Sequence, residues 1–322
     1  MSAPILQIRG LDVAYRSRRG RLRALRQVDL DVPANRIVGI VGESGCGKST
    51  LISAILGLLA PNAQIDAGSI AFEGINLLKA TPGDWARIRG PRIATVFQDP
   101  MTSLNPVISI ATQMVDIQYR LAVPDAEKRR RAVEMLDRVG IPDAAHRIDE
   151  YAHRFSGGMR QRIAIAMALL MRPALLIADE PTTALDVTLE AQIVHLLKSL
   201  KRELDGSILF VSHNLGLIAE LCDEVVIMYA GEVVEHASVR DLFHDPRHPY
   251  TRLLLACDPA RVDEGVATLP TIAGALPDLA ALPTGCVFRA RCPDAVDACL
   301  VTPAVRSVGE GHEVRCVRGG HG

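Results

Sequence analysis

Residues 36–50 read RIVGIVGESGCGKST, and this stretch decides the fold. Residues 36–41 form an almost continuous apolar run, which is typical of a strand buried on both faces of a sheet. Residues 42–49 match the pattern G-x-x-x-x-G-K-[ST], and residues 49–59 continue with helical spacing. A strand, a glycine-rich loop and a helix in this order predict a phosphate-binding loop inside an α/β domain.

The residue types in this phosphate loop (residues 42–49) suit a magnesium-bound triphosphate. Glycines let backbone N–H groups turn toward phosphates, and the start of the following helix adds partial positive charge. Lys48 would reach the β- and γ-phosphates, and Ser49 would hold Mg²⁺. We expect the side chain of Cys46 only to fill space within the loop. The predicted ATP-binding set here is Gly42, Ser44, Gly45, Cys46, Gly47, Lys48, Ser49 and Thr50.

Composition narrows the class of protein. The 322 residues are 48% hydrophobic with a net charge of −1, which allows a large core and gives no sign of a nucleic-acid partner. No apolar stretch reaches the roughly 18 residues of a membrane span, and no secretion signal is visible at the N-terminus. We therefore expect a cytosolic chain whose seven cysteines are reduced or bound to metal.

The remaining pattern alternates strands and helices, which predicts a mainly parallel sheet. The segment from about residue 99 to residue 171 is rich in helical patterns and predicts a separate helical lobe. The texture changes near residue 245, where we place a domain boundary. Further strands are expected at residues 6–15, 28–32, 174–178, 208–211 and 225–229, and helices at 126–139 and 161–171.

An acidic pair follows one of these apolar strands. Residues 175–178 end in Asp179 and Glu180. A buried strand that delivers two carboxylates in a chain with a phosphate loop predicts a magnesium and water site. Asp179 would support Mg²⁺, mostly through water, and Glu180 would orient or deprotonate the attacking water.

A second glycine-rich turn opens a helix at residues 156–161, which read SGGMRQ. Ser156 suits an N-cap, and the two glycines after it expose N–H groups, so this turn (the Ser156 turn, residues 156–158) predicts a second anion site. One chain would then carry two phosphate-binding helix N-termini, and one ATP would need both. A head-to-tail dimer, in which each nucleotide lies between the loop of one chain and the turn of the other, resolves this.

With these motifs in this order, residues 6–239 resemble the ATP-binding subunits of ABC transporters. The phosphate loop is similar to the Walker A motif, and ADEP at residues 178–181 is similar to Walker B with the catalytic glutamate. FSGGMRQ departs mildly from the family signature LSGGQ, with Phe155 for Leu and Met159 for Gln. The resemblance implies a P-loop ABC ATPase domain over residues 1–245, with a mainly parallel sheet core, an antiparallel β subdomain and a helical subdomain.

The resemblance also implies roles for single residues. Gln98 would sense Mg²⁺ and contact the permease, and His213 would contact the γ-phosphate beside the catalytic Glu180. Tyr15 would stack on adenine, and Asp186 would lie in the loop that crosses the dimer interface. The residues that would contact the ATP of the opposite subunit are Ser156, Gly157, Gly158 and Gln161, and those that would serve Mg²⁺ are Ser49, Gln98 and Asp179.

Residues 246–322, the C-terminal extension, resemble the extension of the oligopeptide/dipeptide importer subgroup, which includes nickel importers. The motifs that carry this are HPYTR at 248–252, GCVF at 285–288 and RCP at 291–293. Cys286, Cys292, Cys299 and Cys316 lack the paired spacing of zinc ribbons. Some subunits of the subgroup hold a 4Fe-4S cluster at this cysteine pattern; zinc and free thiols remain the alternatives.

The resemblance implies the ATP-hydrolysing motor of an importer for dipeptides or oligopeptides. Its partners would be two membrane permease subunits, a second ABC ATPase subunit that is identical or homologous, and an extracytoplasmic solute-binding protein, but no nucleic acid. The chain would lie peripherally on the cytoplasmic face of the inner membrane. The alternatives are the same motor for nickel or another small solute, and a soluble ABC ATPase without a transport role.

Overall fold

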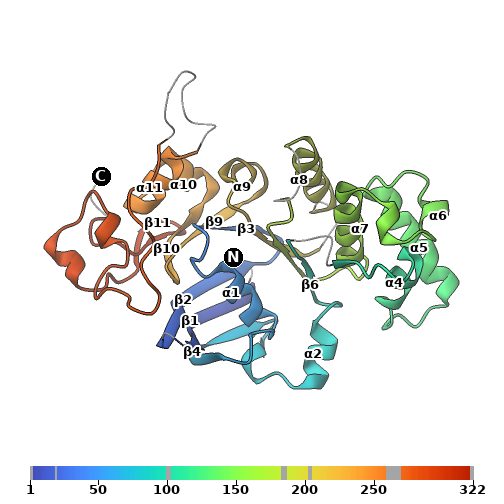
Figure 1. Cartoon of the computed structure of the whole chain (residues 1–322), viewed down its shortest axis with the longest axis horizontal. Coiled ribbons are helices and arrows are strands. Elements are labelled where there is room, and N and C mark those ends of the chain that lie inside the picture. The colour runs from blue at the N-terminus through green and yellow to red at the C-terminus, as the bar shows by residue number, and fades with distance from the viewer. Residues whose placement is uncertain are drawn as a thin grey trace. The chain divides into compact units, whose positions relative to one another are not determined.

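The computed structural model describes residues 3–18, 20–98, 103–182, 187–201, 205–258 and 270–319. The chain divides into two compact units (Figure 1). The first unit comprises Met1–Lys79 and Ser212–Gly322, and the second comprises Ala80–Val211. Among the helices of the described residues, none has both the length and the apolar composition needed to cross a bilayer.

A mixed sheet forms the centre of the first unit. Its strands are β3 (Ile37–Val41), β9 (Glu224–Tyr229), β10 (Glu232–Ser238), β11 (Arg306–Gly309) and β12 (His312–Val314), in the order β11-β12-β10-β9-β3. β3 pairs with β9 in parallel, whereas β9, β10, β12 and β11 pair antiparallel. All five residues of β3 are buried, which confirms the prediction of a fully buried strand before the phosphate loop.

A separate antiparallel sheet lies in the same unit. Its strands are β1 (Pro4–Ser17), β2 (Gly20–Pro33), β4 (Ala63–Phe72) and β5 (Ile75–Asn76), in the order β2-β1-β4-β5, followed by the short helix η1 (Leu77–Lys79). Apolar side chains alternate along β1, so that one face enters the core. This is the antiparallel β subdomain that the family resemblance implied.

The described part of the first unit contains four α-helices, of which all but the first begin at a side chain that caps the helix. They are α1 (Lys48–Ile55), α9 (Leu215–Leu221), α10 (Val239–His244) and α11 (Pro249–Ala256). Asn214 and Ser238 accept backbone N–H groups at the starts of α9 and α10, and His248 does the same for α11. Helices α9, α10 and α11 lie on the side of β9 and β10 opposite the antiparallel sheet (Figure 1).

The second unit joins a parallel sheet to a group of helices. Strands β6 (Ile93–Val96), β7 (Leu175–Asp179) and β8 (Ser207–Val211) pair in parallel in the order β8-β7-β6. The helices, with η2 (Ala152–Arg154), are α2 (Pro82–Ile88), α4 (Ile110–Asp116), α5 (Asp125–Arg138), α6 (Ala144–Arg147), α7 (Gly157–Leu169) and α8 (Val187–Lys201). Helices α4 to α7 gather together, in the region that the sequence predicts as a helical lobe (Figure 1).

The predicted α/β class is confirmed, with a mixed rather than mainly parallel pairing because the chain turns back antiparallel after β9. Much of the C-terminal extension packs within the first unit, where the short helices η4 (Arg289–Arg291) and η5 (Asp297–Leu300) precede β11 and β12, and β12 pairs with β10. The boundary near residue 245 and the limits of the helical subdomain stay predictions.

Candidate ATP site and cysteine cluster

The backbone of the phosphate loop has a shape that side chains would prevent. Gly42 approaches the carbonyl oxygen of Met228 so closely that an added Cβ would lie 2.2 Å from it. Gly47 has φ 112°, and a Cβ there would lie 2.8 Å from the carbonyl oxygen of Ala24. Glycine is needed at both positions because a Cβ would clash with a backbone oxygen, and at Gly47 also because φ is positive. The loop is therefore shaped by strands β2 and β9 around it.

Lys48 is folded back over its own loop. Its side chain is 7% exposed, and Nζ donates to the carbonyl oxygens of Gly42 at 2.6 Å and Glu43 at 3.3 Å. A buried ammonium requires such partners, since desolvation of an unpaired charge is costly. Phosphate oxygens can replace these carbonyl oxygens without leaving the charge unpaired. The arrangement of Lys48 is therefore compatible with binding of a phosphate group.

The other predicted residues of the ATP set lie around the start of α1. Ser44, Gly45 and Ser49 are exposed, whereas the Cys46 side chain is 0% exposed. Burial raises the pKa of the Cys46 thiol, which supports the view that it is a neutral filler. Its contribution to ATP binding stays a prediction, and only its backbone could make one.

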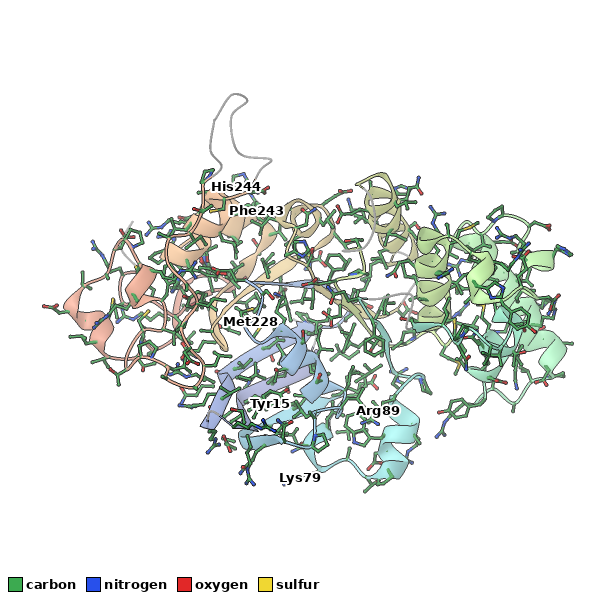
Figure 2. The ribbon with its side chains drawn as sticks, viewed as in Figure 1. Tyr15, Lys79, Arg89, Met228, Phe243 and His244 are labelled. Atoms are coloured by element: carbon green, nitrogen blue, oxygen red, sulfur yellow. The ribbon has the colours of Figure 1, made fainter. Side chains whose placement is uncertain are left out.

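Tyr15 lies on β1 of the antiparallel sheet (Figure 2), and its hydroxyl reaches the helix that follows the phosphate loop. Its hydroxyl is 3.3 Å from Oγ1 of Thr50, and either oxygen could donate. The tyrosine ring is thus tethered beside α1, as a residue that stacks on adenine should be. The stacking itself stays a prediction.

His213 belongs to the first unit and is exposed just before α9. The neighbouring Ser212 N–H donates to the carbonyl oxygen of Ile40 at 3.2 Å, so this segment runs beside the strand that leads into the phosphate loop. The position agrees with a residue that reaches a bound nucleotide. Contact with the γ-phosphate stays a prediction.

The second unit holds the predicted magnesium and water residues together. Asp179 ends β7, and Glu180 follows it with φ 46°, in the left-handed region that a glutamate rarely adopts. Such strain persists where surrounding contacts hold it, and here the Glu180 N–H donates to the Val211 carbonyl oxygen at 2.9 Å. Nε2 of Gln98 donates to Oε2 of Glu180 at 2.9 Å. Two of the predicted residues, 82 positions apart, therefore meet.

The Ser156 turn has the shape predicted for it. Oγ of Ser156 accepts the Met159 N–H at 3.4 Å, and the residue is the N-cap of α7. A Cβ at Gly157 would meet nothing within 4 Å, so this face is open to another molecule. A Cβ at Gly158 would lie 2.9 Å from Leu189, which packs the second glycine against α8.

Gln161 differs from the residues of the Ser156 turn in its exposure. Its side chain is 0% exposed, and neither Nε2 nor Oε1 has a hydrogen-bond partner among the described residues. Helix α7 is buried on several sides around Ile163 and Ile165, so this turn of the helix points into the second unit. Contact of Gln161 with the ATP of an opposite subunit stays a prediction. Asp186 lies outside the described residues, and its role at the dimer interface stays a prediction.

The four cysteines of the extension come near one another. All seven cysteines of the chain are free. Each pair among Cys286, Cys292, Cys299 and Cys316 is close enough for one thiol to raise the pKa of another, although burial is the larger cause. Together these effects raise the pKa of Cys286 to about 11. The Cys286 N–H donates to the Cys299 carbonyl oxygen at 2.9 Å.

This gathering falls short of a closed metal site. Among the residues that the structure describes, no three or more His, Cys, Asp or Glu side chains are grouped so that they could hold a metal ion. The donor chemistry suits a soft metal, since thiolates select zinc or iron–sulfur clusters. A metal in the extension therefore stays a prediction that rests on residue type alone.

Contacts between the extension and the phosphate loop were not predicted from the sequence. Glu43 inside the loop is bound by Tyr250 and Arg291. The one available signal was the RCP motif at 291–293, whose arginine had no assigned role.

A strand, a glycine-constrained loop and a lysine at the start of a helix define a nucleotide-binding protein of the P-loop class. Comparison with known proteins then narrows the class. Residues 25–183 match the family model described as ABC transporter, and residues 234–299 match the one described as oligopeptide/dipeptide transporter, C-terminal region.

Relatives match the chain over almost its whole length. It is 43% identical to the oligopeptide transport ATP-binding protein OppD of Salmonella typhimurium, over 98% of this chain and 93% of OppD. It is 42% identical to the dipeptide transport ATP-binding protein DppD of Bacillus subtilis, over 97% of this chain and 94% of DppD. Among solved structures, the dimeric ATP-binding cassette MJ0796 bound to ADP and Pi matches with a TM-score of 0.65 and 27% identity, over 73% of this chain and 99% of that one.

The chain therefore belongs to the ABC transporter family, as an ATP-hydrolysing subunit that uses ATP and Mg²⁺. The sequence-based prediction of this family is confirmed.

Proposed function

We propose that this chain hydrolyses Mg·ATP to power the uptake of dipeptides or oligopeptides across the cytoplasmic membrane. One observation carries the proposal: the similarity to oligopeptide and dipeptide transport proteins includes the C-terminal region as well as the ATPase core. That region is outside the common ATPase motifs, so it supports a particular branch of the family.

Within the proposed site, each side chain has a separate task. Lys48 binds the β- and γ-phosphates, while Ser49, Gln98 and Asp179 serve Mg²⁺, which neutralises the charge that develops on the phosphates. Glu180 orients the attacking water or takes its proton, and His213 contacts the γ-phosphate. The hydrogen bond from Gln98 to Glu180 supports a coupling between the magnesium sensor and the base.

The second half of the site comes from another ATPase subunit in this proposal. The open face at Gly157 and the N-cap at Ser156 support an anion-binding surface offered to a partner's nucleotide. ATP closes the pair of subunits, and hydrolysis releases it. Permease helices dock near residues 98–106, so that closure moves a membrane gate.

The other partners follow from transport. Two integral membrane permeases carry the peptide, an extracytoplasmic binding protein delivers it, and no nucleic acid takes part. The second ATPase subunit is either a copy or a homologue of this chain. The chain itself lies peripherally on the cytoplasmic face of the membrane.

We also propose that the four cysteines of the extension bind one metal centre, with a 4Fe-4S cluster preferred to zinc. The residue type of these ligands supports this, and the role is structural, because a small segment gains stability from a metal staple. Iron, sulfide and zinc analysis of anaerobically purified protein tests it. Zinc without iron would select the alternative, and neither metal would remove the proposal.

Transport is tested in vesicles that contain the chain, its permeases and its second ATPase. A short peptide with its binding protein should stimulate ATP hydrolysis and accumulate inside, and Lys48→Ala should stop both. Peptide-independent hydrolysis combined with nickel uptake would replace the peptide proposal. Co-purification with ribosomes and with no membrane protein would overturn the transport function altogether.

A further inference from the structure

Arg291 is a cation enclosed by the C-terminal extension and turned toward the phosphate loop. Its side chain is 6% exposed, and Nη1 donates to both carboxylate oxygens of Glu43 at 3.0 Å. The same nitrogen is 3.3 Å from the hydroxyl of Tyr229, to which it donates. Nε and Nη2 donate to the carbonyl oxygens of Ala273 and Ile272 at 2.9 and 3.1 Å.

Within the described part of the chain, Glu43 is the acidic partner of this guanidinium. Arg291 and Glu43 are 248 positions apart in the sequence. Their ion pair therefore joins the C-terminal extension to the phosphate loop. Nη1 contacts both carboxylate oxygens, and removal of one member of the pair would leave the other charge uncompensated. The pair therefore fixes the direction of the Glu43 side chain.

The main chain of Glu43 is held as well. Its N–H donates to the hydroxyl of Tyr250 at 3.1 Å, and its carbonyl oxygen accepts from the Cys46 N–H at 3.1 Å and from Nζ of Lys48 at 3.3 Å. Residue 43 thus stands between the extension and the lysine that reaches the phosphates. A change in the Glu43 backbone would move an acceptor of Lys48.

An aromatic cluster packs around Tyr250 and Arg291, the two residues that bind Glu43. Tyr229, Tyr250 and Phe288 pack with ring centroids 4.7 to 5.3 Å apart, and all three are at most 1% exposed. Contacts between aromatic rings at this distance stabilise their mutual arrangement. Phe288 and Arg291 come from the same turn of the extension, in which the Arg291 N–H donates to the Phe288 carbonyl oxygen at 2.9 Å.

We propose that Arg291 is a positioning residue for ATP binding, which directs the carboxylate of Glu43 away from the phosphates and neutralises it. The inference rests on the proposed ATP site. A carboxylate in a phosphate loop would repel a triphosphate, since like charges brought together in a protected site oppose binding. Arg291 removes that repulsion while it holds the loop that supports Lys48. The extension thereby takes part in nucleotide binding.

The test measures Mg·ATP affinity and thermal unfolding of the full chain and four variants. They are Arg291→Gln, Glu43→Gln, the double variant, and Arg289→Gln as a matched control, because Arg289 lies in the same turn and is exposed. Arg291→Gln should weaken ATP binding roughly tenfold, because it frees the Glu43 charge. The double variant should recover affinity to within about threefold of the wild type, because the repelling charge is gone. Arg289→Gln should leave affinity unchanged.

Rescue separates this role from a merely structural one. If Arg291 only braces the fold, the double variant binds ATP no better than Arg291→Gln, and the proposal is wrong. Affinity within twofold of the wild type for Arg291→Gln itself would also overturn it. If Arg291→Gln does not fold, Arg291→Lys with and without Glu43→Gln decides by the same comparison. Lys48→Ala serves as the reference: should the wild-type chain bind ATP no better than this variant, the proposed function fails rather than the role of Arg291.

Discussion

The phosphate loop and the Ser156 turn are both glycine-containing starts of helices, yet they are built in different ways. The loop is enclosed: Gly42 lies against the Met228 carbonyl oxygen, Lys48 is 7% exposed, and Glu43 is bound by residues of the extension. The Ser156 turn is closed mainly by its own serine cap, and Gly157 faces open space. One is shaped by tertiary contacts and the other by local ones.

This difference indicates how the work is divided. An anion site that is held from several sides is preorganised and binds without further ordering. An exposed turn with open space in front of it is accessible to a ligand that another surface holds. We therefore expect the phosphate loop to bind ATP in a single chain, and the Ser156 turn to matter for turnover in an assembled pair.

The largest effect expected is the loss of turnover with binding kept. Glu180→Gln removes the proposed base, so kcat should fall roughly a hundredfold or more, while ATP stays bound in a stabilised dimer. Phosphate release and nucleotide binding measured on one preparation check this. Glu134→Gln, which changes an exposed helix residue in an ion pair with Arg130, is the control and should change neither. Phosphate release near the normal rate in Glu180→Gln would remove Glu180 from this role.

A negative charge at the Ser156 turn should impair this turn and leave the phosphate loop unaffected. Gly157→Asp fits the open space at this glycine but places a carboxylate where a partner's phosphate is expected. Turnover of the assembled complex should fall roughly a hundredfold, and ATP affinity of the single chain should not change. Gly157→Ala is the size control, with little effect. Unchanged turnover in Gly157→Asp would refute the shared site between two subunits.

The sequence predicted the elements whose pattern is local. The phosphate loop follows a five-residue strand of buried residues, β3, and the acidic pair begins at the last residue of β7, whose first four residues are buried. Both are recognisable because a strand buried on both faces needs an uninterrupted apolar run. Strand β6, with four residues, and the short strands of the extension were missed, because so few residues give no reliable period.

What the sequence could not predict depends on distant contacts. Nothing near Glu43 shows that its partner is Arg291, 248 positions later. The burial of Gln161 was also missed, because α7 carries apolar residues on several sides and the motif suggested an exposed amide. A motif identifies chemistry, whereas exposure is set by the packing of other segments.

Low pH should reduce the stability of the C-terminal extension, which holds the phosphate loop. His248 caps α11 by accepting the Tyr250 N–H at Nδ1 at 3.0 Å, and burial lowers the pKa of this imidazole from 6.5 to about 4 against the opposing effect of Glu235, with Arg252 lowering it further. The unfolded histidine takes up a proton first as pH falls below 6.5, so the stability is complete above this pH and declines toward pH 4. The loss should be about 2 kcal/mol at pH 5.

Urea unfolding at pH 7 and pH 5 measures this loss. His248→Asn keeps an oxygen that can accept the Tyr250 N–H but cannot titrate, so it should lose about 2 kcal/mol less than the wild type between the two conditions. Equal losses in both proteins would show that His248 does not control the acid sensitivity of the extension.

The smallest effect tests how finely the extension controls the phosphate loop. Tyr250→Phe keeps the aromatic packing against Tyr229 and Phe288 but removes the oxygen that accepts the Glu43 N–H. One neutral hydrogen bond contributes about 1 kcal/mol, so ATP should bind roughly threefold to fivefold more weakly. Tyr119→Phe, which removes an exposed hydroxyl bonded to the Ala86 carbonyl oxygen, should leave affinity as it is. Equal affinities for both variants would mean that the hydrogen bond from the Glu43 N–H to Tyr250 does not contribute to ATP binding.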